Sequence, residues 1–137
     1  MEIPDSTSLC TRLRSALEGI LEWKWDGRFG TILAEFPSEK KQGVQDILGR
    51  YLVHRWDSVT IGEAPQIAQR VNGRLGGLMS GQMLLVSDPE DDPLVYCAWW
   101  PWGDGQAISI RIGRFSEMTD AEVQSSLTEE LKSWFGV

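Results

Sequence analysis

The stretch Leu94–Phe115, LVYCAWWPWGDGQAISIRIGRF, decides the predicted fold of this chain. Apolar and polar residues alternate in its second half, and a Gly103–Gly105 turn separates that half from a β-rich first half, as is typical of a hairpin. Asp104-Gly105 is a favoured pair for a tight hairpin turn in which both central residues adopt positive φ. We therefore expect two antiparallel strands, at about 94–100 and 106–113.

The predicted hairpin has one apolar face and one mixed face. A two- or four-residue loop at Gly103–Gln106 pairs Trp99 with Ile110, Cys97 with Ile112 and Trp100 with Ser109, whereas a three-residue loop would exchange Trp99 and Trp100. With the former loops, the core-facing side chains are Val95, Cys97, Trp99, Ile108, Ile110 and Ile112. The mixed face then carries Tyr96, Ala98, Trp100, Ser109 and Arg111, with Trp102 near its rim.

The rest of the chain predicts one α+β domain spanning residues 1–137. Its antiparallel three-stranded meander lies at about 82–87, 94–100 and 106–113, with a further strand near 29–36 that Pro37 ends. Apolar residues at helical spacing predict four helices, at about 6–22, 38–53, 63–75 and 119–135. Residues 56–61 fit either a short strand or an extended linker.

Several residues at the helix ends match capping patterns. Asp5 or Ser6 suits the N-cap of the first helix, and Gly76-Gly77 suits the end of the third. Thr119 and Glu122 form a capping box for the last helix, where Met118 and Val123 are placed for a hydrophobic staple.

The charge of the chain disfavours some classes of partner. The net charge is −7, and the whole excess lies in residues 75–137, which hold ten acids and three bases. Such an acidic half repels phosphate backbones, so we expect no nucleic-acid partner, whereas a protein with a basic surface fits it. No apolar stretch approaches the roughly 18 residues that would span a bilayer, so we expect no membrane association.

The two cysteines indicate a reducing compartment. Cys10 and Cys97 are far apart, and neither belongs to a C-x-x-C pair. Two reduced thiols are typical of a cytosolic protein, and the N-terminus lacks the basic region and apolar run of a secretory signal. We therefore expect a cytoplasmic protein.

Residues with catalytic or metal-binding chemistry are few. His54 is the only histidine, at the expected end of the second helix, and no local signature pairs it with Cys10 or Cys97. The acidic loop at 87–93 lacks the ligand spacing of an EF-hand, so we expect a solvated loop. We predict no catalytic residue, no metal site and no cofactor.

In size, and in ending with a meander and a helix, the chain resembles small acidic secretion chaperones and roadblock or profilin-like modules. This resemblance is one of element order, which does not fix function.

The seven tryptophans direct the functional prediction toward binding. Tryptophan and arginine are enriched at interface hot spots, and exposed rings without a partner favour aggregation. We expect a non-enzymatic protein-binding module, an adaptor, accessory subunit or chaperone-like escort, whose contact residues are Tyr96, Trp100, Trp102 and Arg111. Edge strands in the meander permit a homodimer without requiring one.

Three other functions fit the same sequence. An acidic immunity or antitoxin-like protein would block a basic toxin, and a small-ligand domain would line a pocket with tryptophans. A Cys–His hydrolase would need one thiol beside His54.

Overall fold

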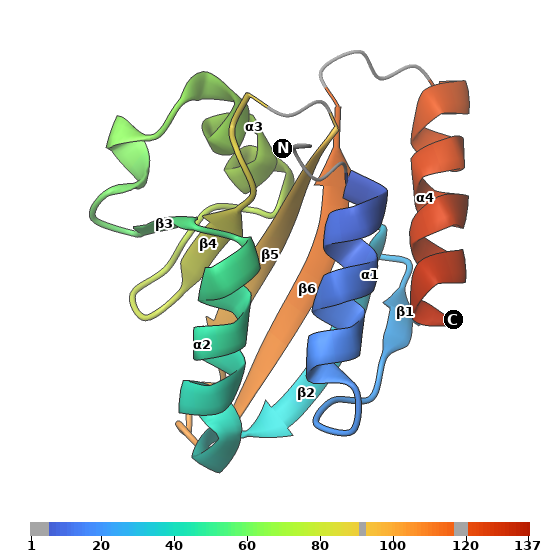
Figure 1. The fold of residues 1–137 in the computed structure, drawn as a ribbon. Coiled ribbons are helices and arrows are strands. Elements are labelled where there is room, and N and C mark those ends of the chain that lie inside the picture. The colour runs from blue at the N-terminus through green and yellow to red at the C-terminus, as the bar shows by residue number, and fades with distance from the viewer. Residues whose placement is uncertain (1–5, 91–92, 117–120) are drawn as a thin grey trace.

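The structure, a computed structural model, describes residues 6–90, 93–116 and 121–137 (Figure 1). Its helices are α1 (Ser6–Leu17), α2 (Lys41–Tyr51), α3 (Gln66–Arg74) and α4 (Ala121–Phe135). The strands are β1 (Lys24–Asp26), β2 (Thr31–Pro37), β3 (His54–Asp57), β4 (Met83–Val86), β5 (Leu94–Pro101) and β6 (Ala107–Phe115). Two single turns of 3₁₀ helix, η1 (Ser38–Lys40) and η2 (Ile61–Glu63), precede α2 and α3.

All six of these strands form one antiparallel sheet in the order β1-β2-β6-β5-β4-β3. The α+β class and the meander of β4, β5 and β6 are therefore confirmed, and β2 is the further strand, paired with β6. The predicted four-stranded arrangement was incomplete, because β1 and β3 extend the sheet at its two edges. The three residues of β1 are too few for the period-two pattern to be recognised, and residues 56–61, which overlap β3, fitted a strand or a linker equally well.

Helices cover the two faces of the sheet unequally. Figure 1 shows α1, α2 and α4 in front of the sheet, whereas α3 lies behind β4 and β5. The front layer buries the larger core, in which Leu13, Leu48 and Leu131 pack on the apolar face of the hairpin. Behind the sheet, α3 contributes a smaller core with Ala68 and Val71 against Leu84.

Two helix boundaries differ from the prediction for physical reasons. α1 ends at Leu17, five residues earlier than expected, because Gly19 adopts a φ of +80° and reverses the chain. The second helical segment begins with η1, and α2 ends at Tyr51. His54 therefore belongs to β3 and not to the end of a helix.

Of the predicted caps, the glycines after α3 lie within the described residues. Gly76 and Gly77 both have positive φ and follow α3, as predicted. Asp5, Met118 and Thr119 lie outside the described residues, so the capping box and the staple of α4 stay predictions. None of the helices in the described ranges has both the length and the apolar character needed to cross a membrane.

Candidate functional site

The hairpin of β5 and β6 has the register predicted for a two- or four-residue loop. Trp99 pairs with Ile110, Cys97 with Ile112 and Trp100 with Ser109. The loop is the four-residue version, closed by a backbone hydrogen bond of 2.9 Å from the Trp102 N–H to the Ala107 carbonyl. Only Gly105 in this turn has a positive φ, at +72°, so the expectation of positive φ at Asp104 was wrong.

The hairpin also has the two predicted faces. The side chains of Val95, Cys97, Trp99, Ile108, Ile110 and Ile112 lie in the core beneath α1, α2 and α4. Tyr96 and Ala98 lie on the rear face beneath α3, and Trp100 packs at the edge of that smaller core. Along β5, α3 therefore covers the rear face at Tyr96 and Ala98, and this cover ends at Trp100.

Beyond this boundary, Trp100, Arg111 and Phe29 form a cluster of rings around a guanidinium group. The guanidinium carbon of Arg111 lies 4.4 Å from the centre of the Trp100 ring and 5.4 Å from that of Phe29. The two rings meet edge to face, with their centres 5.4 Å apart. Cation–π contacts of this kind contribute about 0.5–2 kcal/mol each and fix the orientation of the side chains.

Asp26 holds this cluster from β1. The Arg111 Nε donates a hydrogen bond of 2.7 Å to Asp26 Oδ2, and the two side chains are only 17% and 12% exposed. The other carboxylate oxygen of Asp26 accepts the backbone N–H of Arg28 at 3.1 Å. One aspartate therefore orders both the turn that carries Phe29 and the guanidinium beneath it.

Trp102 is the most exposed ring of this region. Its side chain is 45% exposed, yet its Nε1 donates a hydrogen bond of 2.8 Å to the Ser109 hydroxyl. The ring is consequently held in one orientation while much of it faces solvent. We call the set Phe29, Trp100, Trp102 and Arg111 the aromatic surface.

The aromatic surface differs from the prediction at two positions. Tyr96 is only 6% exposed, because α3 covers it, and burial raises the pKa of its phenol to about 12. Its assignment to the exposed contact is corrected accordingly. Phe29 was not expected there, because it was assigned to a strand and lies instead in the turn between β1 and β2.

That turn carried a signal in the sequence. Asp26-Gly27 and Gly30 bracket Phe29, and the Gly30 N–H bonds the Asp26 carbonyl at 3.0 Å while Gly30 adopts a φ of +68°. Turn residues between two short extended runs indicate a hairpin, whose tip would carry Phe29.

The cysteines and the histidine are not placed together. Cys10 and Cys97 are fully buried, and burial raises the pKa of Cys10 to about 12 and that of Cys97 further still. Cys97 faces the front core, whereas His54 pairs with Val86, which faces the rear core. His54 is exposed on β3 and stacks on Trp56, with ring centres 6.3 Å apart. This geometry offers no support for a Cys–His nucleophile.

The acidic loop likewise shows no ligand set. The Asp88 carboxylate accepts the backbone N–H of Glu90 at 2.9 Å, as in an ordinary Asx turn. Asp91 and Asp92 lie outside the described residues. Within the described ranges, no three His, Cys, Asp or Glu side chains are close enough to share a metal ion.

Comparison of the chain with protein-family models, with curated proteins and with solved structures finds no match. Function is therefore inferred from the aromatic surface itself.

Proposed function

We propose that this protein is a non-enzymatic binding module that contacts another protein through the aromatic surface. One observation carries the proposal: the sheet continues past the edge of α3 and presents a fixed tryptophan, Trp102, that is 45% exposed. An exposed apolar ring costs solubility, so a ring held open in this way favours a partner that covers it.

The supporting groups suit a hot spot. Trp102 is tied to Ser109, and Arg111 is tied to Asp26 and stacked on Trp100, so little rotational freedom is lost when a partner binds. Tryptophan and arginine are the residue types most enriched among hot spots. The aromatic surface is therefore organised before contact.

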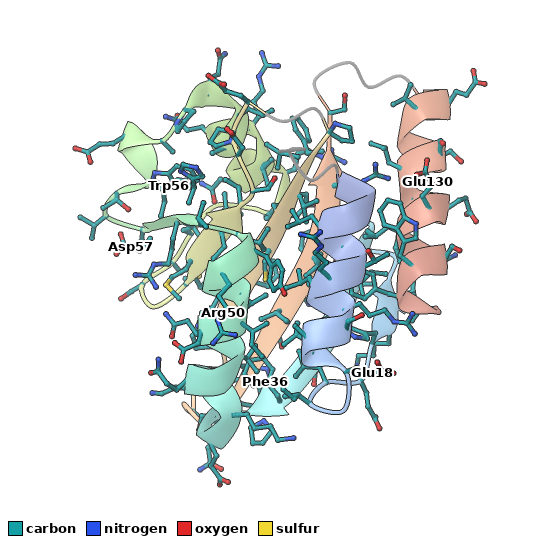
Figure 2. The ribbon with its side chains drawn as sticks, in the orientation of Figure 1. Glu18, Phe36, Arg50, Trp56, Asp57 and Glu130 are labelled. Carbon is teal, nitrogen blue, oxygen red and sulfur yellow. The ribbon has the colours of Figure 1, made fainter. Side chains whose placement is uncertain are left out.

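The charge of the partner is inferred from the charged residues near the aromatic surface. Near the aromatic surface, Arg111 is balanced by Asp26, and Lys24 lies 3.4 Å from Glu35. The exposed acids of α4, by contrast, lie on the front of the molecule, where Figure 2 labels Glu130. We infer that the partner is selected at this surface by apolar and aromatic contact rather than by a basic charge.

A photo-crosslinking amino acid at position 102 tests the proposal in the native host. The crosslinker p-benzoylphenylalanine at position 102 should trap one protein. The same group at position 59, where Val59 is 86% exposed far from the hairpin, should not trap it.

Calorimetry with the purified partner then measures the contribution of the ring. Trp102→Ala should weaken binding roughly tenfold or more, which is about 1.5 kcal/mol, and Val59→Ala should leave the affinity unchanged. Equal affinity for wild type and Trp102→Ala, with both proteins folded by circular dichroism, would exclude the aromatic surface as the contact.

The outer side of α4 favours a second candidate, the acidic immunity-like protein. Glu122 and Glu129 are exposed there, and Glu130 is about half exposed while lying 3.5 Å from Arg114. A basic toxin would bind this helix and not the aromatic surface. Charge reversal by Glu122→Lys with Glu129→Lys would then abolish binding, whereas Trp102→Ala would not.

A further inference from the structure

A groove follows the side of α2 on the front of the molecule, across the sheet from the aromatic surface. Three adjoining shallow cavities of about 390, 400 and 500 Å³ form it, and Gln45 lines all three. At one end it reaches Pro101 and Gly105 of the hairpin, and at the other it reaches Arg55 of β3. The eleven residues of α2 span about 16 Å, which is the length of roughly five extended residues.

The groove is lined by cations although the protein is acidic. Lys41, Arg50 and Arg55 are exposed along it, and none of the three forms an ion pair within the described part of the chain. Figure 2 shows Arg50 on α2, in front of the sheet. Arg55 points to the same side, because it pairs with Leu85, a member of the front core.

The nearby carboxylates accept hydrogen bonds from neutral groups and keep their negative charge. Asp46, one turn before Arg50, accepts a hydrogen bond of 2.9 Å from the Gln42 amide. Asp57, at the end of β3, accepts the backbone N–H groups of Val59 and Thr60 at 2.9 and 3.0 Å. These bonds lower the pKa of Asp57 and hold its charge in the turn. Neither carboxylate forms an ion pair with the three cations in the described part of the chain. The charged residues that line the groove, Lys41, Arg50, Arg55 and Asp46, sum to a charge of +2, which is available to a ligand.

The wall and the floor suit a peptide more than a small anion. Gln42 and Gln45 each carry an amide, which can donate to and accept from a peptide backbone. Leu85 and Trp99 form an apolar floor, and Val53, 63% exposed, flanks one end. Gly49 has no side chain, so the backbone of α2 is exposed to the groove at this position. A Cβ built there would meet no atom within 4 Å. Glycine weakens a helix, but its lack of a side chain lets another backbone approach closely. A glycine in this wall is consistent with such an approach.

We propose that this groove binds an extended acidic peptide segment of a partner, with carboxylates on Lys41, Arg50 and Arg55 and the peptide backbone against Gln42, Gln45 and Gly49. The site lies on the face opposite the aromatic surface, so the protein would hold two segments at once. It does not depend on the function proposed above.

Fluorescence anisotropy of a labelled peptide of alternating aspartate and alanine tests the proposal. Wild type should bind this probe, and raised salt should weaken the binding. Arg50→Ala with Arg55→Ala should weaken it roughly tenfold, since exposed ion pairs contribute up to about 1 kcal/mol each. The matched control is Arg12→Ala with Arg14→Ala, which removes two exposed cations from α1 and should leave the affinity unchanged.

A second variant separates peptide binding from simple charge attraction. Gly49→Ala should raise the melting temperature, because alanine is the better helix former, and should weaken peptide binding by narrowing the groove.

No binding by wild type, equal losses in the two arginine pairs, or undiminished binding by Gly49→Ala would overturn the proposal. So would tighter binding of a single-stranded oligonucleotide of equal charge, which would make the groove a general anion site. Self-association lost in the Arg50 and Arg55 variant would overturn it in favour of a second copy of the chain.

Discussion

Tyr96 and Trp100 project from the same face of β5, four residues apart, and their surroundings differ sharply. α3 covers Tyr96 and leaves it 6% exposed, whereas Trp100 lies at the edge of that core against Arg111. The covered region of the rear face is stabilised by packing, and the open region by a hydrogen-bonded aspartate and stacked rings. One strand therefore borders both a covered and an open region of the rear face. The position of a single nine-residue helix decides which residues belong to each.

The largest expected effect compares a leucine from each region. Leu84 is 1% exposed beneath α3, and Leu33 is half-buried in the open region beside Arg111. Leu84→Ala should lower the unfolding free energy by about 3 kcal/mol, because it leaves a cavity, and Leu33→Ala should cost less than half as much. Urea denaturation of the two variants measures both values. Equal costs would mean that the open region is as tightly packed as the covered one.

Alkaline pH should destabilise the covered region through Tyr96. Its pKa is near 10 when unfolded and about 12 when folded, so the folded state retains the proton over that range. Stability is then fully present below pH 10 and falls by about 2–3 kcal/mol as the pH rises to 12. Tyr96→Phe removes this part of the loss. Denaturation of both proteins from pH 8 to 12 checks it, and identical curves would contradict burial of the phenol.

Gly113 of β6 pairs with Tyr96 and lies beneath its ring in the covered region. A Cβ built at Gly113 would collide with the Tyr96 hydroxyl and ring, so Gly113→Ala should cost about 2 kcal/mol. Gly103→Ala is the matched control, since a Cβ there meets no atom within 4 Å and its φ is not positive. Thermal unfolding should therefore show a clear loss for the first variant and almost none for the second.

The smallest expected effect concerns the open region. Asp26→Asn keeps the acceptor for the Arg28 N–H but removes the charge that holds Arg111, so it should cost about 1 kcal/mol. It should also weaken partner binding, because the guanidinium would lose its fixed orientation. A variant with wild-type affinity would show that Asp26 stabilises the fold without positioning Arg111.

The sequence predicted the local features of the hairpin well. Alternation along residues 107–112 predicted the strand, but the length of the loop, and with it the choice between Trp99 and Trp100 as the core residue, was left open. The structure has the four-residue loop, and it confirms the two faces that were predicted for that loop. The period of a strand reports which side a residue faces, but it does not report what covers that side. Tyr96 was therefore assigned with Trp100, although α3, from a distant part of the sequence, buries only the first.

Two of the remaining differences also depend on contacts between distant parts of the chain, and one depends on a local signal. Asp26 reaches Arg111 across 85 positions of the sequence, a separation that no local pattern reveals. The early end of α1 could have been recognised, because Gly19 is a typical C-terminal helix signal. The groove along α2 was not anticipated, since it needs β3 beside the helix and that strand was left undecided.

The burial of both native thiols has a practical consequence. With their pKa values raised and no solvent access, Cys10 and Cys97 should stay inert to maleimide dyes in the folded protein. A variant such as Val59→Cys would thus carry a single reactive sulfur without removal of the others. Donor and acceptor fluorophores could then follow an incoming ligand on either face in an otherwise unaltered chain.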